Sequence, residues 1–310
     1  MAPTDLLDRL LDLAAVDGRL DVRCELAPGW QIDEAARAER EMPYHVLLAG
    51  TAVIDGPGLP PTPLGPGDVA LLTAGGAHRL RQAGAADAGG LLCGRFIVST
   101  AAWALFRTLL PPLIVVRAAG TDDAQAGRRA TLVALLKAET DTLPPGSAGV
   151  LRHLSAALFG LSLRGAVHGP EPAPGLLALA AHPRLQGVVL GVLAEPGGAW
   201  SIEDMAERAH LSRSSLIRTF QAAASVSPAA FLTAVRMAEA ARRLRDTHES
   251  VAAIGEAVGY ASEAAFQRAF KRETQLTPAA WRARPADEPA PQQAPVHKVV
   301  GPSGGGKARR

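Results

Sequence analysis

The sequence predicts an α+β protein whose strands and helices occupy different parts of the chain. Short apolar runs separated by Gly- and Pro-rich turns extend from residue 19 to residue 96, a pattern typical of a small barrel or sandwich. After residue 100 apolar residues recur at three- and four-residue spacing, which indicates helices. A helix-turn-helix pattern occurs twice in the last third, so we expect an all-α C-terminal domain.

Composition and charge exclude several classes of protein. The 310 residues are 48% apolar and 20% charged, which favours folded domains over disorder. Two cysteines are too few for a disulfide scaffold or an all-cysteine zinc site. The chain has neither a secretory signal nor a run of 18 apolar residues, so we expect a cytoplasmic protein without a membrane partner.

Four regions follow from these patterns. We expect a strand-rich sensor domain at 1–120, a helical connector that pairs subunits at 121–183, a helical domain at 184–284 and a disordered tail at 285–310. The net charge of +2 is no strong basic signal. However, residues 1–183 hold 15 basic and 18 acidic residues, whereas 184–284 hold 13 and 10. This asymmetry permits nucleic-acid binding by the C-terminal half.

The N-terminal elements are predicted from their periodicity. Asp5–Ala15 has leucines at helical spacing, and Gly18 is expected to end that helix. Residues 21–26 alternate, which places Cys24 on the inward face of a strand. Further strands are expected at 44–49, 51–54, 69–73 and 91–98. Helices are expected at 131–140 and 149–163, before a Pro-rich linker at 169–175.

The C-terminal region contains an internal repeat. Adding 50 to the residue number takes Ser212 to Ser262, Arg218 to Arg268 and Phe220 to Phe270. Each copy reads as helix, tight turn and helix, with a serine at the N-cap of the second helix. The buried side of that helix is expected to carry Leu216 and Phe220 in the first copy and Phe266 and Phe270 in the second. One long helix at 228–247 separates the copies. Such a spacer would hold the two units about one DNA turn apart, roughly 34 Å.

A repeated helix-turn-helix is typical of double-stranded DNA binding, with the N-terminal half of each second helix in the major groove. A plain helical bundle with solvated arginines is the alternative, but two copies with matching caps and arginines favour DNA binding. The predicted DNA-binding residues are Ser212, Arg213, Ser214, Ile217, Arg218, Ser262, Glu263, Ala264, Gln267, Arg268 and Lys271.

This region closely resembles AraC/XylS-type transcription regulators. The resemblance rests on the segments 206–220 and 259–272 and on the closing Leu276-Thr-Pro, and it covers about a third of the chain. It implies a homodimeric regulator bound to an operator, with RNA polymerase as a further partner of an activator. Two positions depart from the family pattern: His210 stands at a usual turn glycine, and Ile217 stands at a position often polar.

The strand region resembles the cupin-type subfamily of these regulators. Gly67–His78 is similar to the second cupin motif, with Thr73 at a usual proline, and Pro43–Gly50 is similar to a reduced first motif. The resemblance implies a cupin-like β-barrel with His45 and His78 at ligand positions. A cupin enzyme would need about three protein ligands, so we expect no enzyme activity.

Cys24, His45, His78 and Cys93 lie on four strand segments that a barrel would bring together. One interpretation is that the cysteines are merely small buried residues. Another is a tetrahedral zinc site made by all four side chains. Some cupin-type regulators sense reactive chlorine or related oxidants through cysteines, so the resemblance implies Cys24 and Cys93 as a redox pair. A small organic effector held in the barrel is a further alternative.

Overall fold

The structure, a computed structural model, describes residues 5–84, 89–118, 123–168 and 174–284. It confirms the α+β prediction, with strands in the first part of the chain and helices in the second. The predicted tail at 285–310 and residues 169–173 of the predicted linker lie outside the described residues. Among the helices of the described ranges, none combines the length and apolar character that crossing a membrane requires.

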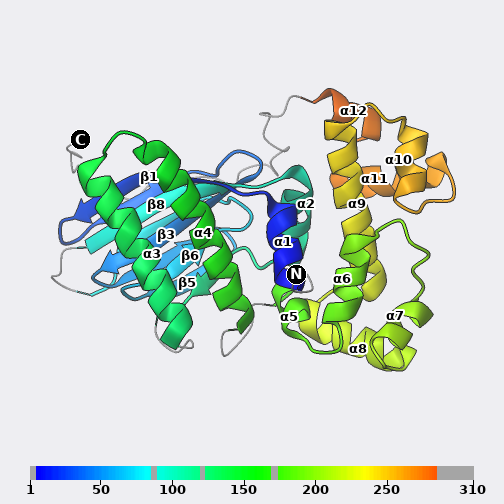
Figure 1. Cartoon of the computed structure of the whole chain (residues 1–310), viewed down its shortest axis with the longest axis horizontal. Helices are drawn as coiled ribbons and strands as arrows, with labels where there is room; N and C mark the ends of the chain where they lie inside the picture. Colours follow the sequence, from blue (N-terminus) through cyan, green and yellow to red (C-terminus); the bar gives the residue numbers. More distant parts are fainter. Residues whose placement is uncertain (1–4, 85–88, 119–122, 169–173, 285–310) are drawn as a thin grey trace.

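Two antiparallel sheets form the barrel (Figure 1). The first sheet has the order β1-β8-β3-β6-β9 and the second the order β2-β7-β4-β5. The strands are β1 (Asp17–Leu26), β2 (Gln31–Glu34), β3 (Glu41–Ala49), β4 (Ala52–Gly56), β5 (Leu59–Leu64), β6 (Val69–Leu71), β7 (His78–Gln82), β8 (Gly89–Ile97) and β9 (Ile114–Val116). Strand β1 pairs only with β8, so it is an edge strand within the described residues.

Alternation along the strands of the larger sheet separates two packed faces. The inner face contributes Leu47 and Leu91 to a core enclosed between the two sheets. The outer face carries Tyr44 and Phe96, whose stacked rings lie 4.4 Å apart. Phe96 also packs edge-on against Phe159 of a helix that covers this face. Both faces of the sheet are therefore buried.

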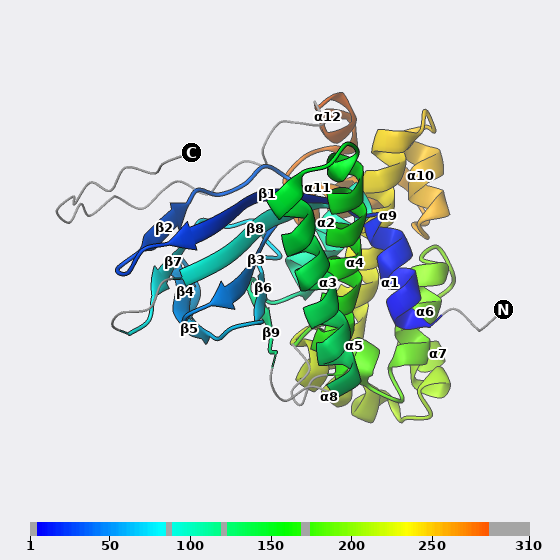
Figure 2. The same ribbon diagram turned by 60° about the vertical axis from the view of Figure 1, so that its left-hand side comes forward.

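Four helices cover the barrel and join it to the rest of the chain: α1 (Leu6–Ala14), α2 (Thr100–Leu109), α3 (Asp123–Thr142) and α4 (Ser147–His168). Helices α3 and α4 form a hairpin, and α4 lies against β1 (Figure 2). Asp5 caps α1 with a reciprocal capping box. The expectation that Gly18 ends this helix is wrong, because the stop is Ala15 in the left-handed conformation.

Gly18 instead has a packing role in β1. A Cβ built at this position would lie 2.5 Å from the backbone nitrogen of Ala156 and 2.6 Å from Cβ of Ser155, both in α4. Only glycine therefore lets the strand approach the helix this closely. The edge strand that carries Cys24 is thus in direct contact with the helical hairpin.

The C-terminal half consists of eight helices within the described residues: α5 (Leu176–Ala181), α6 (Gln186–Ala194), α7 (Ile202–Arg208), α8 (Arg213–Ala224), α9 (Pro228–Asp246), α10 (Val251–Ala257), α11 (Glu263–Thr274) and α12 (Pro278–Ala283). One apolar core runs from the outer sheet face through α1, α2, α5 and α6 into α8 and α9. A separate small core lies among α9, α10, α11 and α12. The predicted boundary at residue 184 therefore divides a continuous core.

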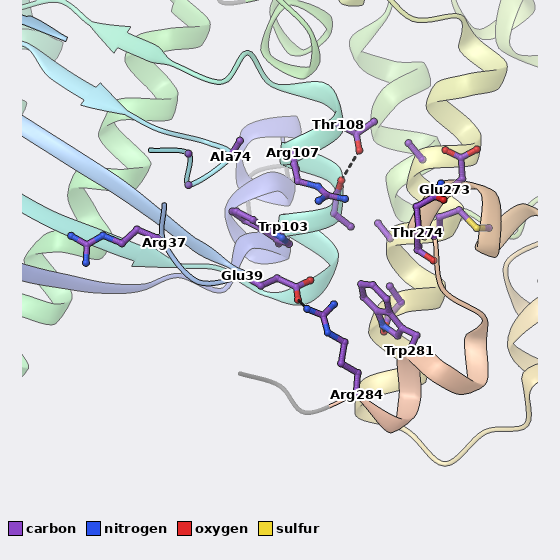
Figure 3. A pocket seen from close by; sticks show the side chains of 18 of the residues that line it. Arg37, Glu39, Ala74, Trp103, Arg107, Thr108, Glu273, Thr274, Trp281 and Arg284 are labelled. Carbon is purple, nitrogen blue, oxygen red and sulfur yellow. Dashed lines mark hydrogen bonds and ion pairs between the residues drawn. The ribbon is translucent and has the colours of Figure 1, made fainter. Parts of the chain in front are cut away.

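The two halves of the molecule meet at α2 and α9, and a cavity of about 590 Å³ lies beside this contact. Its walls include Gly75 and Gly76 next to the barrel. Arg107 of α2 and Trp281 of α12 also line it (Figure 3). An ion pair of 3.2 Å between Glu39 and Arg284 bridges the halves, and their side chains are only 6% and 8% exposed.

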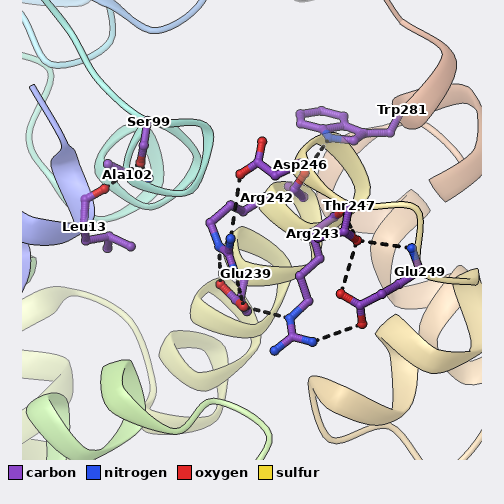
Figure 4. A network of polar contacts seen from close by, with 11 residues as sticks. Leu13, Ser99, Ala102, Glu239, Arg242, Arg243, Asp246, Thr247, Glu249 and Trp281 are labelled. Carbon is purple, nitrogen blue, oxygen red and sulfur yellow. Dashed lines mark hydrogen bonds and ion pairs between the residues drawn. The ribbon is translucent and has the colours of Figure 1, made fainter. Parts of the chain in front are cut away.

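A polar network fixes α9 to the segment that precedes α10 (Figure 4). Arg243 donates to Glu239 at 2.8 Å and to Glu249 at 3.2 Å. Thr247 donates to the same Glu249 at 3.2 Å. These contacts tie the C-terminal end of the spacer helix to the start of the second helix-turn-helix unit.

Candidate nucleic-acid interface and sensor site

The first helix-turn-helix unit is α7 and α8. Ser201 caps α7 in a capping box with Asp204, and Ser212 accepts a hydrogen bond from the backbone of Ser215 at the start of α8. Leu216 and Phe220 are fully buried under α8. The local sequence alone accounts for these boundaries, since both caps are side-chain contacts within three residues.

The second unit is α10 and α11, and it repeats this construction. Ser250 caps α10 and Ser262 caps α11. Phe266 and Phe270 are buried, as expected from the repeat. Helix α9, which separates the units, begins with Pro228 behind the cap Ser227.

The predicted DNA-binding residues share one property, exposure on the second helix of a unit or at its cap. Those of the first unit are Ser212, Arg213, Ser214, Ile217 and Arg218. Those of the second are Ser262, Glu263, Ala264, Gln267, Arg268 and Lys271. Ile217 is 43% exposed, so its apolar side chain is accessible to a partner on this face of α8.

The turns of the two units differ in strain. Gly259 in the second turn has φ = +84°, and His210, its counterpart in the first turn, has φ = +52°. An L-residue pays a steric cost in this left-handed region that glycine does not pay. The departure seen in the sequence is therefore a strained residue in the structure.

We expect His210→Gly to raise the free energy of unfolding by about 0.5–1 kcal/mol, because it removes this strain against a smaller entropic cost of glycine. Thermal or urea unfolding of the full chain measures the change. The reciprocal control, Gly259→Ala, should destabilise, because alanine would be strained at φ = +84°. Destabilisation by His210→Gly would contradict the assignment of strain.

Inside the barrel, three of the four predicted sensor residues form a buried chain of contacts. Sγ of Cys93 lies 3.1 Å from Nδ1 of His45. Nε2 of His45 lies 2.7 Å from Nε2 of His78. Nδ1 of His78 lies 2.9 Å from the carbonyl oxygen of Gly76. The exposed fractions of the three side chains are 6%, 1% and 4% along this chain.

The carbonyl group at the end of this chain of hydrogen bonds determines which atom donates in each of them. The Gly76 carbonyl only accepts, so Nδ1 of His78 carries its hydrogen and Nε2 is an acceptor. Nε2–H of His45 therefore donates to His78. The free Nδ1 of His45 then accepts from the thiol of Cys93. All three groups are neutral and satisfied in this arrangement.

Burial shifts the pKa of each group toward its neutral form. Desolvation, followed by the neighbouring His78, lowers the pKa of His45 to about 3. Desolvation also lowers the pKa of His78. The pKa of the Cys93 thiol is raised to about 12, again mainly by burial. Cys93 is therefore a thiol at neutral pH and a weak nucleophile.

Cys24 lies on β1, beside this chain rather than within it. It pairs with Leu91, whereas Cys93 is opposite Val22. The two cysteines are thus diagonal neighbours on one sheet face. Cys24 is half-buried, and desolvation and the charge of Glu34 raise the pKa of its thiol. Val22, which the alternation of residues 21–26 places on the same strand face as Cys24, is 45% exposed.

Two protein families match this chain. The cupin family matches residues 5–168, and a helix-turn-helix domain family matches residues 205–284. The "RCS-specific HTH-type transcriptional activator RclR" of Escherichia coli K12 is 32% identical over 280 residues, which cover 90% of this chain and 98% of that protein. The chain belongs to the AraC-type transcription regulators with an N-terminal cupin domain.

A second named regulator and a solved DNA-binding domain are also similar to parts of this AraC-type regulator. The transcriptional regulator MtrA of Neisseria gonorrhoeae is 28% identical over 90% of this chain and 98% of its own length. A solved structure, the DNA-binding domain of AdpA in complex with a target DNA, is 30% identical over 31% of this chain and 86% of that chain, with a TM-score of 0.30. The chain is a DNA-binding regulator, and its relatives are not enzymes.

The barrel residues do not fit a zinc ion as they lie. Within the described ranges, no three His, Cys, Asp or Glu side chains are grouped so that they could hold a metal ion. The physical reason is that the two nitrogens of His45 contact different partners, Cys93 and His78. One ion could bind all three only after the His45 ring rotates. The four-residue zinc set therefore stays a prediction.

Sequence reasoning missed the residues that connect the barrel to the DNA-binding half. Glu39 and Arg284 are 245 residues apart in the chain and carry no local pattern. A sequence motif could not indicate the contact with the Gly76 carbonyl, because every residue has a backbone carbonyl group. The cupin motif that ends in His78 could have indicated only that the loop before His78 lies near the site.

Specific DNA affinity should depend on the two arginines that recur at an offset of 50. Arg218 and Arg268 are exposed on α8 and α11. Replacing either with alanine should cost about 1–3 kcal/mol of specific binding if it makes a bidentate base contact. A gel-shift titration with the full-length protein measures the loss. Unchanged specific affinity in both variants would refute the assignment.

Acid should destabilise the barrel through its histidines. The pKa of His45 is about 3 in the folded protein and has its ordinary value of 6.5 in the unfolded chain. Between these two pH values His45 is therefore protonated in the unfolded chain and neutral in the folded protein. The neutral His45 stabilises the folded state fully above about pH 6.5. This contribution to the free energy of unfolding falls with pH, by about 2 kcal/mol between pH 7 and pH 5. Urea unfolding at both pH values measures it. A His45→Asn variant should show a flatter dependence, and an unchanged slope would contradict this origin.

Proposed function

We propose that this regulator responds to an oxidant of the hypochlorous acid class through Cys24 and Cys93. The observation that carries the proposal is the contact of the Cys93 thiol with His45 in a buried chain that ends at the interdomain cavity. A relative that this chain matches over nine tenths of its length is described as RCS-specific. The raised pKa of both thiols argues for a strong oxidant, since a neutral thiol reacts slowly with weak ones.

The half-buried Cys24 reacts first, because the oxidant reaches it more easily than Cys93. Its thiol and hypochlorous acid give a sulfenyl chloride and water. The sulfur of Cys93 then displaces chloride from Cys24 and forms the disulfide, and the thiol proton is released to water, because the low pKa of His45 keeps its ring neutral. The oxidant gains the two electrons that the thiols lose.

Disulfide formation requires the edge strand to move. Diagonal neighbours in an antiparallel pair lie about 7–8 Å apart, whereas a disulfide needs Cα atoms within about 7 Å. Strand β1 can shift, since it pairs only with β8 and has an irregular register between Leu20 and Val22. Its Gly18 contact would transmit that shift to α4.

Oxidation also breaks the hydrogen-bond chain in the barrel. A disulfide sulfur cannot donate, so Nδ1 of His45 loses its partner and the ring is free to reorient. His78 is hydrogen-bonded to His45 and to the Gly76 carbonyl, so reorientation of the His45 ring would disturb both contacts. Gly76 lines the cavity next to the Glu39–Arg284 ion pair, so the rearrangement reaches the DNA-binding half.

The test uses protein purified without oxygen. Operator binding and free thiols are measured while hypochlorous acid is titrated into the wild type, Cys24→Ala, Cys93→Ala and the double variant. We expect the wild type to lose two thiols per chain as its DNA binding changes, and the double variant to show no change. His153→Ala, a helix histidine outside the barrel, is the matched control and should respond like the wild type.

A full response of the double variant would refute the cysteine mechanism. Metal analysis of the same samples tests the zinc set separately. One zinc per chain, released as the thiols disappear, would support coordination by Cys24, His45, His78 and Cys93. Absence of zinc together with a thiol-dependent response would leave the disulfide route alone.

The interdomain cavity favours a small organic effector as the second candidate function. Its volume of about 590 Å³ suits a small molecule. Arg107 of its wall offers a positive charge and Trp281 an apolar surface. An effector would change operator binding in the cysteine double variant as well, which separates it from the oxidant mechanism.

We further propose a homodimer that pairs through the α3–α4 hairpin. An apolar groove of about 400 Å³ lies on this hairpin, beside Leu135, which is 51% exposed. Arg128 and Arg164 flank it, and Glu139 of a second copy would complement them. Sedimentation of Leu135→Glu should give monomers, and dimers would contradict this surface.

We also propose that the protein contacts RNA polymerase if it is an activator. We place it in the cytoplasm, where its DNA lies.

A further inference from the structure

The two recognition helices present different side chains at equivalent positions. In α11, Nε2 of Gln267 donates to Oε1 of Glu263 at 2.7 Å. Both side chains are exposed one helical turn apart in the N-terminal half of the helix. The equivalent positions in α8, fifty residues earlier, are Ile217 and Arg213. Only the second unit therefore carries a hydrogen-bonded pair at this place.

The Glu263 carboxylate fixes the orientation of the Gln267 amide. An ionised carboxylate only accepts hydrogen bonds, so it must face the amide nitrogen and not the amide oxygen. One N–H of Gln267 is used in this contact. Within the described residues the amide oxygen of Gln267 makes no hydrogen bond, and the side chain is exposed, so this oxygen and the second N–H are available to a partner.

We propose that Gln267 reads an adenine in the major groove and that Glu263 is its positioning residue. Adenine presents an acceptor at N7 next to a donor at N6, which matches one amide N–H and one amide oxygen. No other base presents this pair in the major groove. Holding the amide in place avoids the loss of rotamer freedom that an unsupported glutamine pays on binding.

The same comparison predicts an asymmetric operator. Ile217 has no polar atom, so it contributes an apolar contact that suits the methyl group of thymine. Arg218 and Arg268 are equivalent in the two units. The half-site under α11 therefore has an adenine requirement that the half-site under α8 lacks, and the two half-sites are not simple repeats.

The experiment begins with selection of binding sites from a randomised DNA duplex library by the full-length wild type. Each A·T pair of the selected site is then replaced in turn, and affinities are measured for the wild type, Gln267→Ala, Glu263→Ala and Glu263→Gln. Gln267→Ala should lose roughly ten- to hundred-fold of discrimination at one A·T pair. Glu263→Ala should lose part of the discrimination at the same pair.

Glu263→Gln separates positioning from charge. Its side-chain oxygen still accepts from Gln267, so discrimination at that pair should persist, while removal of a negative charge strengthens binding to all duplexes. Ile217→Ala is the matched control and should alter a base pair in the other half-site. Full discrimination by Glu263→Ala would overturn the positioning role. Equal loss in Glu263→Gln and Glu263→Ala would instead show that the carboxylate itself reads a base.

Discussion

Replacing Phe270 with alanine should lower the free energy of unfolding by about 3–5 kcal/mol and abolish specific DNA binding. Its side chain is fully buried, with ring centroids 5.6 Å from Phe266 and 5.8 Å from Trp281. The core around it is small and separate from the large core of the molecule. A cavity of a phenyl ring's size cannot be filled by so few neighbours, so α11 loses its support.

Hydrogen exchange of the full chain measures this effect by region. We expect faster exchange in α10, α11 and α12, and little change in α8, whose support is part of the larger core. Arg272→Ala on the exposed side of α11 is the control and should leave stability within about 0.5 kcal/mol. A loss below about 1 kcal/mol in Phe270→Ala would show that the second unit does not depend on this core.

Gly18→Ala should destabilise the N-terminal half by about 3 kcal/mol, at the upper end of overpacking effects. The new Cβ would meet the backbone of Ser155 and Ala156 in α4, and backbone cannot move aside as a flexible side chain does. The strand must then separate from the helix. Because the same contact carries the proposed shift of β1, the variant should also weaken the response to oxidant.

Thermal unfolding and the titration of operator binding with hypochlorous acid measure the two effects of Gly18→Ala. Gly127→Ala in α3 is the matched control, because nothing lies within 4 Å of its added Cβ. That control should stabilise by about 0.5–1 kcal/mol, since alanine favours a helix over glycine. Wild-type stability of Gly18→Ala would refute the close contact of β1 with α4.

The sequence by itself determined the elements whose causes are local. Ser212 and Ser262 cap their helices through contacts three residues away, and the repeat at an offset of 50 predicted the buried Phe220 and Phe270. Alternation predicted the strand at 21–26, and short apolar runs between turns predicted those at 44–49, 51–54, 69–73 and 91–98, whereas β2, β5, β7 and β9 were not predicted. Such signals depend on residues that are close in the sequence, so they can be recognised without knowledge of the tertiary structure.

The sensor site was predictable only in part. Its residues were predicted from cupin positions, and the structure brings His45, His78 and Cys93 into contact. The diagonal placement of Cys24 was not predictable, because it depends on the register between β1 and β8. A shift of one residue in that register would have turned Cys24 to the other face.

Tertiary structure alone decided how the sensor meets the DNA-binding half. The contact of α2 with α9 and the Glu39–Arg284 ion pair join segments with no sequence relation to each other. Helix periodicity indicates that a face is buried but not which partner covers it. The orientation of Gln267 by Glu263 likewise required atomic positions, because helical spacing permits that hydrogen bond without demanding it. The family pattern in the sequence therefore established a DNA-binding regulator, and packing between distant segments determined the route by which a signal can reach it.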